Sequence, residues 1–441
     1  MTMAFPGFTM MFWGGFMLMG LVMIRYGYIF LVPDGLGPRK RSGKAWMESL
    51  TTFGSMITKL KNGWLFICIK QAKQLFGIRL LKHFLLTNSS ITSSILSIVQ
   101  LTHSLDLRTG GVAKAVCDLS DAFKTKNVEN LIFDNPSSKQ LNSLLGANLV
   151  IAHGLWQWPG RSAVKLKKKY DVPYIVFPHG MLDPWFKENY PLKHLKKQLY
   201  WFWKQSSIMK DASAVCFTTE EEMMSAQKTF WPFSCKQIVT GIGVGDPPAG
   251  EVKQKALFKE KFSVTSKKKI LLYMGRIHPK KGLDLLLSSF AKQARSEHVL
   301  IIAGPINDQC GYTQKLARTY NSSRGVQWTG MLEGDLKWGA LRSADAMILP
   351  SHQENYGMVV AEACSVGTPV LITNKVNLFR EILQYDAGFV DNDSQEGVDN
   401  LIKKWISGKV QSKKLHAINC FKEKLHIYST AEKIIDIAIK R

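Results

Sequence analysis

The sequence predicts an α/β protein with two parallel-sheet domains, preceded by a hydrophobic and basic N-terminal extension. From about residue 95 onward, short apolar runs rich in β-branched residues alternate with stretches of helical periodicity, which implies parallel strands connected by helices. This alternation is interrupted once, by a polar, Lys-rich segment at residues 249–268 that we interpret as a linker. A chain of 441 residues is also too long for one typical core.

The extension begins with a hydrophobic segment at residues 1–34, which has no charged residue before Arg25. This apolar stretch is long enough to cross a bilayer, which takes roughly 20 residues, and the basic residues after it favour a cytoplasmic location for the remainder. We treat the segment as a candidate membrane anchor, with a spurious extension of the reading frame as the alternative. Residues 35–94 form a basic amphipathic connector, which favours a helix on a membrane surface or a helix packed on the next domain.

The composition indicates a polyanionic partner and a reducing compartment. The formal net charge is +24, so nucleic acid, acidic lipid and phosphorylated ligands are all candidate partners. No RNA- or DNA-binding motif accompanies this charge, and nucleic-acid binding is therefore kept only as an alternative. The seven cysteines are scattered and lack CxxC spacing, which argues against a disulfide framework or a zinc site.

The first α/β domain is predicted over residues 95–248. Its first strand, "SILSIVQL", is followed by a loop with Gly110 and Gly111 and then by a helix. Glycine lets a ligand approach the backbone, and a helix N-terminus offers free N–H groups. Two later strands, in "NLVIAHGLW" and "VPYIVFPHGML", lead into His153 and His179. Because ligands bind at the carboxyl edge of an open parallel sheet, these residues indicate a cleft there.

A basic and aromatic stretch, "PLKHLKKQLYWFWKQ", lies later in this domain. Lys193, Lys196 and Lys197 interleave with apolar residues and with Trp201, a pattern that suits the lipid headgroup boundary. The alternative is a helix that buries its aromatic side chains and exposes its lysines. The glycine-rich "KQIVTGIGVGDPP" that follows does not open a helix, so we interpret it as a crossover into the second domain and not as a dinucleotide-binding motif.

The second α/β domain is predicted over residues 269–425, with a C-terminal helix at residues 426–441. Its strands lie in "KILLYMG", "HVLIIAGP", "VQWTGML", "SADAMILPS" and "TPVLIT". The loop after the first of these strands carries Arg276 and Lys281 beside the start of a helix. Two cations in such a place suit a diphosphate, and a solvated basic turn is the alternative.

Two glutamates eight residues apart follow the strand "AMILP". Glu354 lies in the loop at the carboxyl end of the strand, and Glu362 lies further along, in the helix. Gly357 lets the backbone approach a ligand, and the free N–H groups of residues 356–359 can bind a phosphate. Because carboxylates accept hydrogen bonds from vicinal hydroxyl groups, the two acids can hold a sugar and a ribose on either side of a diphosphate. The pattern predicts a nucleotide-sugar site.

The segments "GRIHPKKG" and "ENYGMVVAE", with "ACSVGTPV" after them, resemble the retaining glycosyltransferases of family four. This resemblance covers residues 94–441 and implies the GT-B architecture, in which two Rossmann-like domains face a cleft. The segments "HGLW" and "PHGMLDPW" resemble the subset that acts on bacterial surface polysaccharides. The chain departs from the family in two places. The segment between residues 123 and 149 is short for the family, and "NKVNLFREI" replaces a glycine-rich turn.

The resemblance also implies roles for individual residues. Glu354 and His179 would be catalytic, beside the transferred sugar, and His153 and Asp183 would lie on the acceptor side. The donor would be bound by Gly110, Gly111, Arg276, Lys281, Asn355, Tyr356, Gly357, Met358 and Glu362. No metal and no cofactor would be required, and the "DND" at residues 391–393 is interpreted as a polar turn.

From these observations we expect a hexosyltransferase-type glycosyltransferase that moves a sugar, with retention, from a nucleoside diphosphate sugar to an acceptor. The acceptor would be lipid-linked or an oligosaccharide, in the synthesis of exopolysaccharide, O-antigen or capsule. The protein would lie on the anionic cytoplasmic face of the inner membrane, peripherally or through its N-terminal anchor. The alternative enzyme is one that processes a nucleotide sugar without transfer, such as an epimerase.

Overall fold

The computed structural model describes residues 2–5, 8–11, 19–25, 28–33, 96–106, 111–137, 140, 146–265, 267–305 and 311–440. The chain divides into two compact units, Met1–Ser93 and Ser94–Arg441. The first unit contains a sheet in the order β1-β2-β4-β3, with strands Thr2–Phe5 (β1), Phe8–Met11 (β2), Met19–Arg25 (β3) and Tyr28–Pro33 (β4). Within the described residues, no helix is both long and apolar enough to cross a membrane. The anchor at residues 1–34 stays a prediction, and the connector helix expected at residues 35–94 lies outside the described residues.

The N-terminal domain of the second unit is built on a six-stranded parallel sheet in the order β10-β9-β8-β7-β5-β6. Its strands are Ser97–Leu101 (β5), Glu129–Phe133 (β6), Leu149–His153 (β7), Tyr174–Phe177 (β8), Ala214–Phe217 (β9) and Gln237–Val239 (β10). Strands β7, β8 and β9 are buried throughout, which explains their continuous apolar sequences. The sequence analysis did not identify β6, an edge strand whose residues are partly exposed.

Helices cover both faces of this sheet. Alternate residues of β5 and β7 enter two separate cores: Val99 and Val150 pack in one, Ile98 and Ile151 in the other. The helices are Gly111–Thr125 (α4), Trp158–Tyr170 (α6), Trp185–Asn189 (α7), Pro191–Tyr200 (α8), Ser206–Asp211 (α9) and Glu220–Ala226 (α10), and a π-helical turn at Trp201–Gln205 joins α8 to α9.

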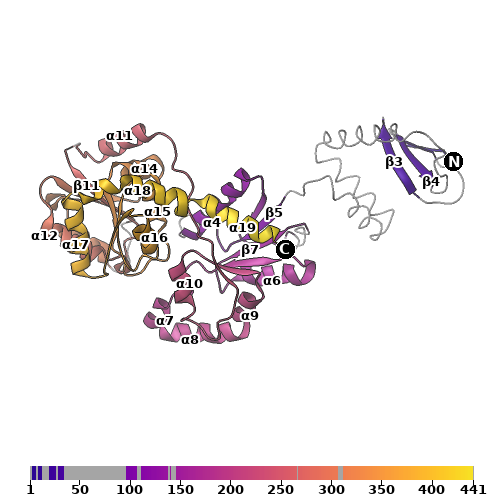
Figure 1. Cartoon of the computed structure of the whole chain (residues 1–441), viewed down its shortest axis with the longest axis horizontal. Helices are drawn as coiled ribbons and strands as arrows, with labels where there is room; N and C mark the ends of the chain where they lie inside the picture. The colour runs from indigo at the N-terminus through magenta and orange to yellow at the C-terminus, as the bar shows by residue number, and fades with distance from the viewer. Residues whose placement is uncertain are drawn as a thin grey trace. The chain divides into compact units, whose positions relative to one another are not determined.

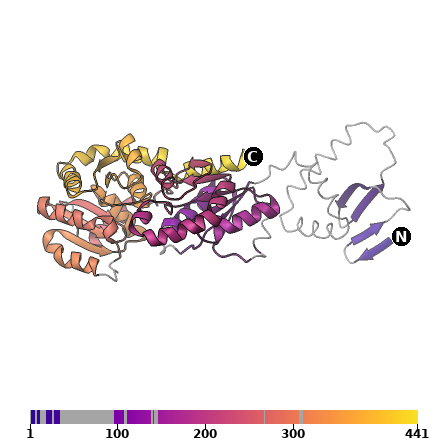
Figure 2. The same cartoon turned by 90° about the horizontal axis from the view of Figure 1, so that it is seen from below.

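The C-terminal domain contains a second six-stranded parallel sheet, in the order β13-β12-β11-β14-β15-β16. Its strands are Lys269–Met274 (β11), His298–Ala303 (β12), Val326–Gly330 (β13), Ala346–Leu349 (β14), Val370–Thr373 (β15) and Gly388–Asp391 (β16). Its helices include Leu283–Gln293 (α12), Tyr312–Thr319 (α13), Gly334–Ser343 (α14), Met358–Ser365 (α15), Phe379–Gln384 (α16), Gln395–Ile406 (α17) and Lys414–Cys420 (α18). The predicted architecture of two α/β domains is therefore confirmed (Figures 1 and 2).

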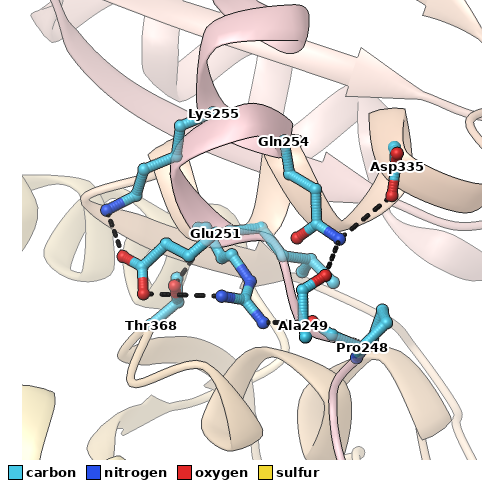
Figure 3. A network of polar contacts seen from close by, with 9 residues as sticks. Pro248, Ala249, Glu251, Gln254, Lys255, Asp335 and Thr368 are labelled. Atoms are coloured by element: carbon cyan, nitrogen blue, oxygen red, sulfur yellow. Dashed lines mark hydrogen bonds and ion pairs between the residues drawn. The ribbon is translucent and has the colours of Figure 1, made fainter.

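The predicted linker at residues 249–268 is in fact part of the C-terminal domain. It contains helix α11 (Glu251–Lys261), which packs against α14. The Gln254 Nε2 group donates hydrogen bonds to the Ala249 carbonyl (3.1 Å) and to Asp335 Oδ1 (3.0 Å), as Figure 3 shows. The sequence hid this helix because its eleven residues bury only Gln254 and Phe258, which leaves almost no amphipathic pattern.

The last helix returns to the N-terminal domain. Helix α19 (Ile427–Ile439) packs against α4 and contributes Ile427 and Ile434 to a core of the N-terminal sheet (Figure 1). The outgoing crossover lies beside this return: Val244 forms a parallel bridge with His426. A Cβ atom on Gly243 would lie 2.6 Å from the Ile427 backbone nitrogen, so this position requires glycine. The glycine-rich crossover thus packs against residues 426–427, the other chain segment that connects the two domains.

Candidate functional site

The loop between β14 and α15 places Glu354 at the carboxyl edge of the C-terminal sheet. The Glu354 backbone is held on both sides, because its N–H donates to the Lys375 carbonyl (2.9 Å) and its carbonyl accepts from the Asn377 N–H (3.1 Å). Residues 375–377 belong to the "NKVNLFREI" segment, whose departure from the family pattern left its role open. In this chain the segment therefore positions Glu354.

Lys281 and Glu354 form a mostly buried ion pair. Lys281 ends a 3₁₀ turn, Pro279–Lys281, and the next residue, Gly282, has φ +63°. A Cβ atom at Gly282 would lie 2.1 Å from the Pro350 carbonyl oxygen, so only glycine lets this turn approach the strand end before Glu354. The structure thus joins one residue predicted to bind the diphosphate to one predicted to contact the sugar.

Arg276, the other predicted diphosphate residue, is exposed beside the same turn. Its charge, together with that of Lys281, contributes to lowering the pKa of Lys280, although burial is the main cause of that shift. The Lys280 ammonium also lies over the ring of Trp185, 4.5 Å from its centroid. The basic turn therefore faces the N-terminal domain, where an anion between the domains would meet several cations.

Helix α15 begins directly after Gly357, which has φ +77°. The first N–H groups of a helix lack intrahelical partners and attract anions, so this N-terminus suits a phosphate. The side chain of Tyr356 is only 6 % exposed and packs in the domain core, so we expect only its backbone to reach a ligand. Glu362, one turn into the helix, is buried and accepts a hydrogen bond from Lys337 Nζ (2.6 Å).

Glu362 also lines a pocket of about 310 Å³ between the two domains. Trp338 lies on the same wall, while Lys114 and Asp118 of α4 and Asp246 of the crossover line other parts. An aromatic ring, a carboxylate and a lysine in one pocket can bind a nucleoside by stacking and hydrogen bonding. The pocket thus places Glu362 beside residues of the N-terminal domain, and its ribose role stays a prediction.

Residues of the two domains meet across the cleft, among them the predicted donor residues Gly111, Asn355 and Met358. A Cβ atom on Gly111 would lie 3.6 Å from Met358 Cγ, and one on Gly180 would lie 2.7 Å from Asn355 Cγ. Asn355 Nδ2 donates to Thr218 Oγ1 (3.3 Å). Gly110 lies outside the described residues. The sequence analysis expected a cleft lined by strand ends of both sheets, and the structure brings these residues together there.

Glu222, which was not among the predicted site residues, supports this meeting point. Its carboxylate accepts from the Gly180 N–H (2.6 Å) and from both the N–H and the hydroxyl of Thr218 (2.7 and 2.6 Å). Its own N–H donates to Thr219 Oγ1, so Thr219 caps the N-terminus of α10. Burial raises the pKa of Glu222, and these three donors act against that rise. Glu222 thus anchors the turn that carries His179.

His179 is the cleft end of a hydrogen-bonded chain that runs into the N-terminal domain. His153 Nδ1 lies 2.9 Å from His179 Nε2, and His153 Nε2 lies 2.9 Å from Gln100 Oε1. Gln100 Nε2 faces the carbonyl of Val116 (3.4 Å) and Asn130 Oδ1 (3.3 Å). We call Gln100, His153 and His179 the histidine relay.

The hydrogen-bond network assigns the tautomers of the relay. A backbone carbonyl only accepts, so the amide nitrogen of Gln100 must face Val116 and the amide oxygen must face His153. His153 then carries its proton on Nε2 and accepts at Nδ1, which requires His179 to donate from Nε2. Neutral His179 is left with a lone pair on Nδ1. Burial lowers the pKa of His153 well below its usual value and that of His179 to about 4, so both rings are neutral at pH 7.

The relay changes the expectation for His153. This side chain is only 2 % exposed and lies behind His179, so it supports His179 and does not face an acceptor. Asp183, the other predicted acceptor-side residue, accepts from the Trp185 N–H (2.8 Å) and from the Gln353 side-chain amide of the C-terminal domain. Burial raises the pKa of Asp183. Asp183 thus links the two domains at the cleft.

The aspartates of the "DND" turn have local partners. Asp393 lies 2.6 Å from the ring nitrogen Nδ1 of His352, and Asp391 lies 4.0 Å from the ammonium of Lys404. In the part of the chain that the structure describes, no group of three or more His, Cys, Asp or Glu residues is arranged to hold a metal ion. The two carboxylates of the turn thus lie near nitrogen atoms of His352 and Lys404.

Two families match this chain. Residues 138–233 match the family described as "Glycosyl transferase 4-like domain", and residues 254–419 match "Glycosyl transferases group 1". These regions lie in the N-terminal and C-terminal domains. The second region starts inside α11, in agreement with the place of that helix in the C-terminal domain.

Curated relatives match parts of the chain. An uncharacterized glycosyltransferase of Methanocaldococcus jannaschii is 26 % identical over 159 residues, which cover 35 % of this chain and 40 % of that protein. A D-inositol 3-phosphate glycosyltransferase of Kineococcus radiotolerans is 24 % identical over 194 residues, or 42 % of this chain and 45 % of that protein. The chain thus spans less than half the length of these relatives.

Solved structures share the fold over both domains. Sucrose-phosphate synthase from Thermosynechococcus elongatus aligns with a TM-score of 0.61 at 15 % identity, over 78 % of this chain and 98 % of that one. HepE from Anabaena, in complex with UDP and glucose, aligns with a TM-score of 0.62 at 13 % identity, over 78 % and 100 %. Together, the two family matches and the GT-B fold support membership of this chain in a glycosyltransferase family of the family-four type.

Proposed function

We propose that this protein transfers a glycosyl residue from a nucleoside diphosphate sugar to an acceptor, with retention of the anomeric configuration. The observation that carries the proposal is the Lys281–Glu354 pair at the N-terminus of α15, opposite Gly180 and the histidine relay. When the donor binds, its diphosphate replaces the Glu354 carboxylate as the partner of Lys281. The Glu354 carboxylate then accepts hydrogen bonds from the hydroxyl groups of the sugar. Donor binding thus replaces one ion pair by two sets of ligand contacts.

Charge develops on the leaving diphosphate as the glycosidic bond breaks. Lys281, Arg276 and the N–H groups at the start of α15 stabilise this charge, which is the main catalytic effect available to the site. Neutral His179 contributes a hydrogen-bond acceptor at Nδ1 and no positive charge at pH 7. The incoming acceptor hydroxyl attacks from the face that the diphosphate leaves, and the departing phosphate oxygen receives its proton. With the positive charges of Lys281 and Arg276, the proposed transfer does not need a metal ion.

The nucleoside is bound in the interdomain pocket. Glu362 accepts hydrogen bonds from the ribose hydroxyl groups, and Lys337 holds its carboxylate in position. A nucleotide-sugar donor is supported by a structural neighbour, since HepE was solved with UDP and with UDP-glucose. A lipid-linked or oligosaccharide acceptor in surface-polysaccharide synthesis is supported by the "HGLW" and "PHGMLDPW" segments.

The test is a thermal-shift screen of the purified protein against a panel of nucleoside diphosphate sugars, followed by NMR of the reaction products. We expect one donor to stabilise the protein, and the anomeric signal of its product to match the donor configuration. The Glu362→Gln variant should lose the donor-induced shift. An inverted product would refute retention. Conversion of the donor into another nucleotide sugar without any acceptor would instead support the epimerase alternative.

A further inference from the structure

Helix α8 and the π-helical turn after it expose a continuous apolar stripe. Leu192, Leu195 and Leu199 recur at helical spacing and are mostly exposed, and Phe202 and Trp203 extend the stripe. Trp203 is 88 % exposed and Leu192 83 %. A contiguous exposed patch of large apolar side chains marks an interaction site on a globular protein.

The expected membrane role of Trp201 is wrong, because this side chain is buried. Its ring stacks on Phe230 (5.0 Å between centroids) and on Phe233 (5.8 Å), and its Nε1–H donates to the Pro232 carbonyl (2.8 Å). The π-helical turn has the effect that Trp201 points inward while Phe202 and Trp203 point outward. Trp201 therefore fixes the stripe to the domain and leaves its neighbours free for a partner.

Two pockets are lined in part by other residues of α8, namely His194 and Gln198 in one and Lys193, His194 and Lys197 in the other. One, of about 580 Å³, is lined by Lys187 and Lys228 together with Trp231. The other, of about 220 Å³, is lined mainly by apolar atoms, with Lys193 and Lys197 at its edge. Both pockets share His194, Thr229 and Phe230.

The electrostatics of the two pockets select an anion. Among the described residues that line them, none is acidic. Burial is the main cause of the lowered pKa of His194 and of Lys197. The charges of Lys187 and Lys197 lower the pKa of His194 further, and the charge of Lys193 lowers that of Lys197. Such mutual repulsion between cations is relieved when an anion binds.

We propose that α8, the π-helical turn and the two pockets form a docking surface for an anionic lipid bilayer. The apolar stripe enters the headgroup boundary, and the lysines of the pockets hold lipid phosphate groups. An anionic bilayer fits better than a protein partner, because the surface combines an exposed apolar stripe with pockets that contain lysines and no acidic residue, and the chain carries a net charge of +24. The surface places this protein on an anionic membrane leaflet.

The surface also bears on the acceptor, and this step depends on the proposed function. Met181 lines the smaller pocket and lies two residues after His179. A lipid phosphate held there would be close to the chain segment that carries the cleft histidine. The surface can therefore deliver the head of a lipid-linked acceptor to the cleft.

The test is hydrogen–deuterium exchange of the full chain with three additions: phosphatidylglycerol-containing vesicles, pure phosphatidylcholine vesicles and inorganic phosphate. We expect residues 190–205 to be protected by the anionic vesicles only. Because each basic residue near an anionic surface contributes about 1 kcal/mol, the double variant Lys187→Gln/Lys228→Gln should need about 30-fold more lipid for half protection. The control Lys315→Gln/Lys409→Gln removes the same charge from exposed positions of the C-terminal domain and should leave the protection unchanged.

Three other results would overturn the proposal. Vesicle binding without protection of residues 190–205 would assign membrane association to another part of the chain. Protection by inorganic phosphate alone would indicate a site for free phosphate and not for a bilayer. Equal protection by phosphatidylcholine vesicles would show that the lysines do not contribute to membrane binding. The triple variant Leu192→Ser/Leu199→Ser/Trp203→Ser should lose protection while nucleotide binding, measured by calorimetry, remains. If nucleotide binding fails in the unaltered protein but protection persists, the proposed function fails and the docking surface stands.

Discussion

The tautomer of His179 is predicted to depend on Gln100, a residue that does not reach the cleft. Replacing Gln100 with methionine keeps the side chain similar in length but removes the acceptor of the His153 Nε2–H. One buried donor is then unsatisfied, which should lower the free energy of unfolding by about 1–3 kcal/mol. His153 can escape this cost by moving its proton to Nδ1. His179 must then accept at Nε2 and carry its own proton on Nδ1.

This exchange of protons removes the acceptor that His179 offers to a ligand. Loss of one neutral hydrogen bond should weaken turnover about 2- to 10-fold, which corresponds to about 0.5–1.5 kcal/mol. The control is Gln254→Met, which breaks two hydrogen bonds of a buried glutamine in the C-terminal domain. It should lower stability by a similar amount and leave His179 unchanged.

The assay is two-dimensional NMR of the full chain labelled with ¹⁵N-histidine, since the ring nitrogen shifts distinguish the two neutral tautomers. We expect His179 to be an Nε2–H tautomer that stays neutral until the pH approaches about 4. Buried His298, whose Nδ1 accepts from the Arg295 N–H (2.9 Å), serves as an internal reference. An Nδ1–H tautomer in the unaltered protein, or an unchanged His179 signal in Gln100→Met, would refute the relay.

Three further predictions concern the cleft. Lys281→Ala should weaken nucleoside diphosphate binding about 10- to 150-fold, because it removes a charged hydrogen bond worth about 1.5–3 kcal/mol, and unchanged affinity by calorimetry would exclude its diphosphate role. Glu354→Gln should reduce kcat more than it reduces nucleotide affinity, whereas Glu362→Gln should reduce nucleotide affinity more than kcat. Identical effects in the two variants would contradict the proposal that Glu354 contacts the sugar and Glu362 the ribose. Gly180→Ala should lower Tm more than Gly408→Ala, because both residues have positive φ (+75° and +78°) but only Gly180 faces a neighbour, Asn355, within 3 Å; an equal loss would argue against the interdomain contact.

Much of the fold was predictable because the central strands are buried on both faces. "KILLYM" and "HVLIIA" read as continuous apolar runs, and the structure pairs them as β11 and β12. The elements that were missed have weaker local signals. Strand β6 lies at a sheet edge with partly exposed residues, and α11 buries only two side chains, so neither shows a clear hydrophobic period.

The residues of the candidate site also differ in how far the sequence predicted them. Glu354, Lys281 and Gly357 were predicted as site residues because they lie in loops between strands and helices, which are local features of the sequence. Gln100 and Glu222 were not assigned roles at the cleft, because each acts through a partner more than 40 residues away, His153 and Gly180 respectively. Spacing along the chain carries no information about such contacts.

The sequence by itself determined the α/β class, the central buried strands and the residues at the ends of those strands, since these depend on hydrophobic period and turn chemistry. Only the tertiary structure decided which side of each amphipathic segment is covered. Trp201 and Trp203 lie two residues apart, yet one is buried against Phe230 and the other is exposed. It also decided that His153 supports His179 from behind, because burial and pairing depend on neighbours that only folding brings together.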